Sequence, residues 1–276
     1  MSGDACDDVD DAKSALERLG ESDETRRDAL RQIRAWLEEQ PLRARVEDKY
    51  LLPFLRVSKF DQAKTKRRVT NYYTMKRDRP EWYQDRDPLI PELAELVKLG
   101  VFLPLRRRGV DKRLVVIIRT AVHDPKKHQQ NDVFKVGKMI LDVACMEYEP
   151  VQLYGVCAIF DMSGISYAHY RELTPGVVMN VVHAWQNHYV SPKTLEFVNA
   201  PVYVNIALDV FKRFMSSKMR DRVLVHYGGV ESVPQDVLPP EYGGSGDSVA
   251  ELADYWLGKL VEYRDWFVED EAFRAD

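Results

Sequence analysis

Apolar positions in the first third of the chain recur at helical spacing. Residues 28–40 repeat leucine and isoleucine at intervals of three and four, and Pro41 ends that pattern. Residues 48–57 show the same spacing, and Asp61 is placed to cap a third helix. This stretch contains no alternation typical of a strand. The pattern predicts a three-helix N-terminal domain over residues 25–90.

Beyond residue 90 the pattern changes to alternating strand and helix. Short, continuously apolar runs rich in β-branched residues predict strands that are covered on both faces. The expected strands are 114–119, 153–161, 195–199 and 224–227, separated by helices over 131–146, from 174 onward and over 201–215. Repeated strand, helix, strand predicts an α/β fold with a mostly parallel sheet. We assign it to residues 91–246, with a C-terminal helix in 247–276.

Composition and charge narrow the class of protein. The chain has 276 residues, a net charge of -4 and 45% hydrophobic residues, enough to form a core without disulfides. Its apolar runs are too short to span a membrane, and the acidic residues 1–24 read as a partly disordered leader without signal-peptide features. The three cysteines show no CxxC spacing. We therefore expect a cytoplasmic protein, in which two acidic ends flank a basic middle.

Motifs for catalysis are missing from the sequence. It contains no GxxxxGK[ST] phosphate loop, no GxGxxG after a strand and no GxSxG nucleophile elbow. Histidines 123 and 128, like 183 and 188, are five residues apart, a spacing that does not align two ligands on one helical face. We expect no enzyme activity, cofactor, metal or nucleic-acid partner. A hydrolase or nucleotide enzyme stays open as an alternative, with Ser163 as the residue to test.

The segment 201–223 combines an apolar stripe on one helical face with a pair of basic residues that follow it. Val204, Leu208, Phe211 and Met215 advance by four, three and four residues and so share one helical face. Lys218 and Arg222 follow at a spacing of four residues and present a joint positive charge. Ordinary core packing and a membrane-docking lid with a basic step are both compatible with this pattern.

Five segments of the chain, in order, resemble the CRAL-TRIO lipid-transfer family, whose members include carriers of tocopherol and retinaldehyde. They are YLLPFLRVSKFDQAKTKRRVTNYY, DPKKHQQNDVFKV, IFDMSGI, PVYVNIALDVFKRFMSSKMRDRV and LPPEYGG. The resemblance covers residues 29–244. It implies an α/β lipid-binding domain that encloses one hydrophobic ligand, such as tocopherol, a retinoid or a similar isoprenoid, beneath a mobile gate helix.

The resemblance also implies which residues line the ligand pocket, and all are apolar or aromatic. They are Phe134, Ile140, Val143, Val156, Phe160, Ile165, Leu173, Val181, Trp185, Tyr189, Leu195, Phe197, Val204, Leu208, Phe211 and Met215. A water-insoluble ligand with few polar anchors suits such a lining.

A phosphoinositide-binding cleft beside the gate is the second implication of the resemblance. Its matching cations are Lys193, Lys218 and Arg222, joined by Lys59 and Arg56, and its partner would be phosphatidylinositol bisphosphate at a membrane surface. The chain departs from the family pattern at several places: Ser58 and Ser191 replace expected basic residues, and Gly137 and Leu141 replace serines near the ligand. The alternative function is a phospholipid- or phosphoinositide-exchange protein or a membrane-recruited signalling adaptor.

Overall fold

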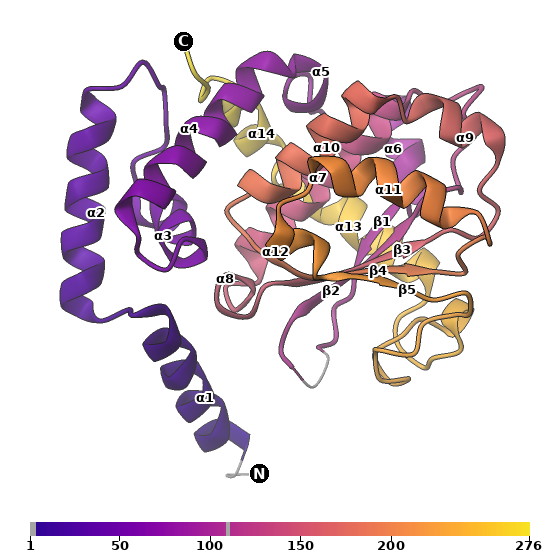
Figure 1. Ribbon diagram of the computed structural model, residues 1–276, viewed down its shortest axis with the longest axis horizontal. Coiled ribbons are helices and arrows are strands. Elements are labelled where there is room, and N and C mark those ends of the chain that lie inside the picture. Colours follow the sequence, from indigo (N-terminus) through magenta and orange to yellow (C-terminus); the bar gives the residue numbers. More distant parts are fainter. Residues whose placement is uncertain (1–3, 109–110) are drawn as a thin grey trace.

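The structure is a computed structural model that describes the backbone of residues 4–108 and 111–276 and the side chains of residues 12–108 and 111–276 (Figure 1). Its first half is helical: α1 (Asp4–Leu19), α2 (Asp23–Glu38), α3 (Asp48–Val57), α4 (Gln62–Asp78), α5 (Pro80–Tyr83) and α6 (Pro91–Lys98). The bounds of α3 are those expected from the sequence. Asp61 caps α4 by accepting a hydrogen bond from the backbone N–H of Lys64 at 3.0 Å.

Helix α1 occupies a region in which the sequence predicted a partly disordered leader. Its apolar residues from Ala12 to Leu19 fall at helical spacing, and Ala15 is buried. Gly20, with φ of +75°, ends the helix in a left-handed conformation. The acidic composition of this segment led to the prediction of disorder, although the segment also contains one short apolar helical face.

A mostly parallel sheet forms the second half, as predicted, but it has five strands, and the first of them, over residues 102–104, was not expected from the sequence. The strands run in the order β1 (Phe102–Pro104), β2 (Leu114–Arg119), β3 (Val156–Asp161), β4 (Pro192–Val198) and β5 (Val223–Val225). β1 is antiparallel to β2, and the other neighbours are parallel. The strand expected from residue 153 begins later, because α8 (Val151–Tyr154) and Gly155, with φ of +81°, precede it.

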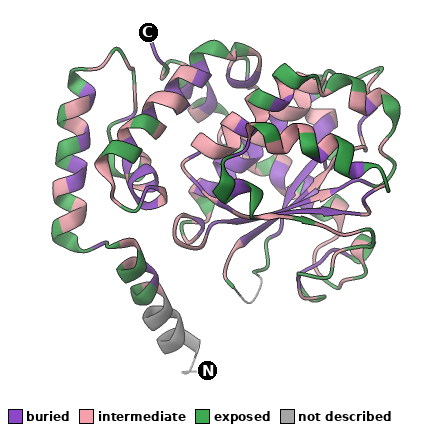
Figure 2. Ribbon diagram, viewed as in Figure 1, coloured by how far each residue is buried: buried purple, intermediate pink, exposed green. Residues whose placement is uncertain are grey.

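Helices cover one face of the sheet, and an extended segment covers the other (Figures 1 and 2). The helical layer contains α7 (Gln130–Glu147), α9 (Tyr167–Glu172), α10 (Pro175–Asn187), α11 (Val204–Phe214) and α12 (Ser217–Arg220). The opposite face packs against Val233, Val237 and Leu238, from the segment that leads into the 3-10 turn η1 (Pro240–Tyr242). The chain thus has one core on each side of the sheet.

The C-terminal region forms two helices, α13 (Val249–Glu262) and α14 (Arg264–Asp270), where the sequence predicted one. α13 packs against both cores through Trp256 and Leu252. No helix in the described part of the chain is long and apolar enough to cross a membrane.

A buried ionic cluster joins α14 to the helical half of the chain. The carboxylate of Asp270 accepts hydrogen bonds from Lys76 at 2.6 Å, Arg86 at 2.8 Å and Arg45 at 3.1 Å. All four side chains are buried. Burial lowers the pKa of Lys76, and the negative charge of Asp270 opposes that change. The cluster therefore holds α14 and three other segments of the chain in one relative position.

We predict that Asp270→Asn lowers the free energy of unfolding by about 3–5 kcal/mol, because it leaves three buried cations without their carboxylate. Urea denaturation of the full chain measures the change. Glu269→Gln is the matched control: Glu269 contacts Arg45 at 3.3 Å, but its side chain is 65% exposed, so its loss should cost less than about 1 kcal/mol. Equal costs for the two variants would contradict the prediction.

Candidate functional site

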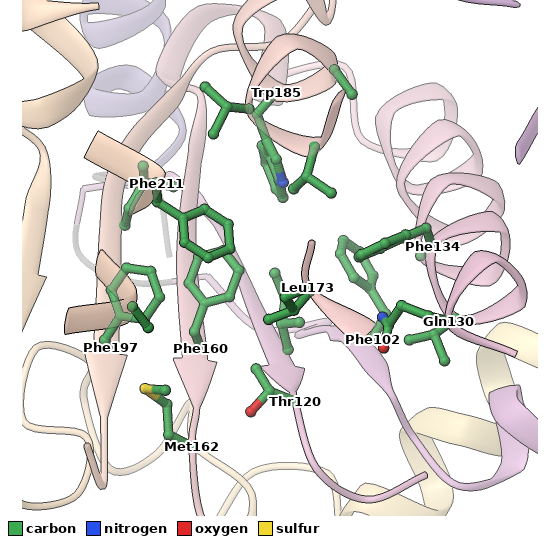
Figure 3. A pocket seen from close by; sticks show the side chains of 18 of the residues that line it. Phe102, Thr120, Gln130, Phe134, Phe160, Met162, Leu173, Trp185, Phe197 and Phe211 are labelled. Atoms are coloured by element: carbon green, nitrogen blue, oxygen red, sulfur yellow. The ribbon is translucent and has the colours of Figure 1, made fainter. Parts of the chain in front are cut away.

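A cavity of about 200 Å³ lies between the helical layer and the sheet. The floor is formed by β2, β3 and β4, and the walls come from α7, α10 and α11. Figure 3 shows aromatic side chains that point into it from several elements, among them Phe134, Phe160, Trp185 and Phe211. The rings of Phe160 and Phe197 stack with centroids 4.7 Å apart. One water needs only about 10–15 Å³ of such space, so the cavity is large enough for a small molecule.

Twelve of the sixteen residues expected around a ligand line this cavity. They are Phe134, Phe160, Ile165, Leu173, Val181, Trp185, Leu195, Phe197, Val204, Leu208, Phe211 and Met215. They come from α7, α10, α11, two strands and the turns that follow β3 and α9. The stripe of 204, 208, 211 and 215 therefore faces the cavity.

The other four expected residues do not line it. On α7 the cavity face is formed by Val133, Phe134, Gly137, Lys138 and Leu141, which recur at helical spacing. Ile140 and Val143 lie on the other faces of that helix, buried in the core. Val156, at the start of β3, is also buried in the core.

Tyr189 is the fourth of these residues, and it faces the helical half of the chain instead of the cavity. Its hydroxyl donates to Asp142 at 2.8 Å, and its ring packs edge-on against Tyr72 at 5.8 Å.

A second depression, of about 590 Å³, opens between α4, α12 and the start of β4 and is strongly basic. Its cations are Lys59, Lys64, Arg67, Arg68, Lys218 and Arg222. Asp61 is the single acidic residue among the described residues that line it, and Lys64 pairs with its carboxylate at 2.8 Å. We call this depression the basic cleft.

Positive charges in and beside the basic cleft repel one another. Burial, followed by the charges of Arg222 and Lys218, lowers the pKa of Lys193 to about 8. Burial and the neighbouring Arg67 lower the pKa of Arg68 to about 10. An anion bound in this cleft would relieve both effects.

The expected phosphoinositide residues divide between the basic cleft and its surroundings. Lys59, Lys218 and Arg222 line the cleft. Lys193 adjoins it, with its aliphatic stem against Gly155, where a Cβ would lie only 2.7 Å from the Lys193 side chain. Arg56 does not line it.

Arg56 is instead buried in a double contact with Glu21, at 2.8 and 3.0 Å, and donates to Gln152 at 2.7 Å. Glu21 lies 35 positions away in the chain, so nearness of Arg56 to Lys59 in the sequence could not reveal this pairing.

The cavity and the basic cleft share a wall. Trp185 on α10 and Met219 on α12 line both of them. Gln186, beside Trp185, accepts a hydrogen bond from the backbone N–H of Ser216 at 2.7 Å and donates to the carbonyl of Phe214 at 3.4 Å. The end of α11 is therefore tied to α10 at the edge of the cleft.

A family model described as "CRAL/TRIO domain" matches residues 100–244, more than half of the chain. The chain belongs to the CRAL-TRIO family. CRAL-TRIO proteins bind and transfer lipids, and this relationship gives no indication of catalysis. A second model, described as "Pinta-like, UBA domain", matches residues 22–93.

Curated relatives within the CRAL-TRIO family include the Clavesins. Clavesin-1 of Xenopus laevis is 25% identical over 240 residues, which cover 84% of this chain and 72% of that protein. Clavesin-2 of Homo sapiens is 23% identical over 205 residues, 72% of this chain and 62% of that protein. The chain spans 58% of the length of Clavesin-1 of Rattus norvegicus.

Among solved structures, Sfh5 has the same fold. Its TM-score is 0.55 with 13% sequence identity, and the match covers 91% of this chain and 100% of that one.

Several residues of the cavity and of the basic cleft were not predicted from the sequence. Trp82 and Phe102 line the cavity from α5 and β1, two elements of three or four residues. Lys64, Arg67 and Arg68 line the basic cleft from α4. The signal for these cations was present as the run KTKRR, directly after the capping Asp61.

We predict that Phe160→Asp reduces uptake of an apolar fluorescent probe at least about tenfold, because it places a charge in an apolar cavity. Probe titration measures the uptake, and thermal unfolding checks that the variant folds. Tyr167→Asp is the control, since its side chain is among the exposed apolar groups at 78% exposure. Unchanged uptake by folded Phe160→Asp would contradict the assignment of this cavity as the binding site.

Proposed function

We propose that the protein is an intracellular carrier that holds one hydrophobic ligand in the cavity beneath α11 and exchanges it at membranes. Candidate ligands are tocopherol, a retinoid or a similar isoprenoid. The observation that carries the proposal is the aromatic and aliphatic cavity, which α11 closes with Val204, Leu208 and Phe211.

Transfer of a lipid from a membrane to the protein requires a binding site that is closed to water. Burial of apolar surface is worth about 25 cal/mol per Å², so a lipid leaves a membrane readily only for a site that excludes water equally well. A closed site in turn needs a part that moves. α11 is suited to this role, because it is the element that carries an unbroken apolar stripe over the cavity.

The outer side of α11 is also partly apolar near its beginning. Val202 is 86% exposed and Ile206 is 74% exposed, with Tyr203 between them. An exposed apolar group of this kind is typical of a surface that contacts another apolar phase. On a bilayer these side chains would leave water, and that contact would favour the open position of α11.

The decisive experiment is mass spectrometry of the organic extract from the purified full chain. We predict a co-purified hydrophobic molecule in wild-type protein and its loss in Ala207→Trp, which fills the cavity from α11. Asp209→Trp places the same ring on the exposed side of that helix and should retain the molecule. If wild-type protein yields no lipid and binds none that is added, the carrier function is wrong.

The basic cleft favours a second function, recruitment to phosphoinositide-containing membranes. Lys218 and Arg222 lie together in a cleft with a net positive charge and share the wall formed by Trp185 and Met219 with the cavity. A multiply charged phosphate headgroup would find several cations there at once. A headgroup bound in the cleft would therefore contact the side chains that also enclose the ligand.

We predict that Lys218→Ala combined with Arg222→Ala weakens binding to vesicles that contain phosphatidylinositol bisphosphate by about tenfold or more, since each surface cation contributes about 1 kcal/mol. Co-sedimentation at fixed ionic strength measures it. Lys98→Ala combined with Lys126→Ala removes the same charge from exposed positions outside the cleft. Equal loss in both double variants would show general charge attraction and overturn the headgroup site.

A further inference from the structure

A single lysine, Lys138, lines the otherwise mainly apolar cavity from α7. Side chains around this part of the cavity are Trp82, Phe134, Val181 and Ala184, which belong to one apolar cluster. The described residues that line the cavity include no aspartate or glutamate. The described side chains that line the cavity with Lys138 therefore supply no acidic partner for its ammonium group.

Contacts of Lys138 confirm that its charge is unpaired. Within the described part of the chain it makes no hydrogen bond and no ion pair, and its Nζ lies 4.7 Å from the centre of the Tyr83 ring. A ring face attracts a cation, but it does not replace a counter-ion. Lys138 thus differs from the buried Lys76, which pairs with Asp270.

Asp142 is one helical turn from Lys138, yet its oxygens have other partners. Oδ1 accepts from the Tyr189 hydroxyl at 2.8 Å and lies 3.5 Å from Nε2 of His188. Oδ2 lies 3.5 Å from the Arg86 guanidinium. Of these partners His188 lines the cavity, whereas Tyr189 and Arg86 do not, and Asp142 forms no ion pair with Lys138.

Burial lowers the pKa of Lys138 to about 8, with the nearby charges of Arg86 and Lys76 adding to the effect and that of Asp142 opposing it. At neutral pH most of the amine is still protonated. A charge in such a place is costly unless a partner compensates it. An anionic group on the bound molecule would be that partner.

We propose that Lys138 anchors the carboxylate of the bound ligand, so that the cavity selects a lipid acid, either a fatty acid or an isoprenoid acid, over its uncharged counterparts. This inference rests on the proposed carrier function and specifies the head of its ligand. The surroundings favour a single carboxylate, because Lys138 is the one lysine among the described residues that line the cavity, and the other lining cation, Arg119, already donates to the carbonyl of Leu99 at 2.9 Å.

The experiment compares ligands that share a chain and differ in the head. Delipidated full-length protein is titrated at pH 7 with oleic acid, oleyl alcohol and methyl oleate, and with retinoic acid and retinol to distinguish the two sources of carboxylate. We expect wild-type protein to bind each acid at least about tenfold more tightly than its alcohol. Lys138→Met should remove or reverse that preference while it keeps the affinity for the alcohol.

Lys135→Met is the matched control, because Lys135 is a buried lysine on the same helix that does not line the cavity. It should keep the preference for the acid. A second readout is the pH profile: the preference should decline as pH rises above about 8, where the free amine loses its proton, and a purely structural lysine would not produce this profile.

The outcomes separate this inference from the carrier function. If neither acid nor alcohol nor ester binds, the carrier function fails. If the alcohol and ester bind and wild-type protein shows no preference for the acid, or if Lys138→Met retains the preference, the role of Lys138 is overturned.

Discussion

A cavity in a protein core lowers the stability of the fold, and packing elsewhere in the molecule must offset that loss. Side chains that border a void lose contacts that a filled core would provide. On the opposite face of the sheet, Ile117 and Ile159 pack in a second core of buried side chains with Val237. The Asp270 cluster adds rigid ionic contacts at the junction with the helical half. The cavity can therefore stay open without loosening the fold.

Two environments of opposite character lie on either side of one thin wall. Trp185 and Met219 border an apolar cavity on one side and a group of cations on the other. Large side chains of this kind shield a hydrophobic space from nearby charge and water. Any movement of α12 toward an anion would shift Met219 and so change the cavity. The proposed membrane contact and ligand exchange thus need no long path between them.

Elements with a long, regular pattern were predictable, and short elements were not. α3 and β2 have the bounds that the sequence indicated, because their apolar residues repeat over a full element. β1 and α5 are too short to produce a period, although they supply Phe102 and Trp82 to the cavity. Ion pairs between distant parts of the chain could not be predicted either. No residue near Arg56 in the sequence indicates its contact with Glu21.

For the residues around the cavity, the number of apolar faces on each helix determined whether the sequence could indicate which face lines the cavity. α11 has one buried side, and the residues of its apolar stripe line the cavity. α7 is apolar on several sides, and Ile140 and Val143 were assigned to a face that belongs to the core. The same apolar character made Lys138 easy to overlook, although a lysine within such a helix is itself an informative departure.

The hydrogen bonds at the end of α11 bear on the proposed opening of that helix. Gln186 holds the backbone at Phe214 and Ser216, whereas the N-cap position at Tyr203 has no side-chain cap. If α11 opens as proposed, the end tied by Gln186 would be the pivot, and the 11 residues of the helix give a lever arm of about 16 Å. Displacement is then greatest beside Val202 and Ile206 and smallest beside the cations. In the proposed carrier, the end of α11 near the cations would be the hinge and the far end the exit, so that a headgroup stays bound at the hinge while the lipid passes at the other end.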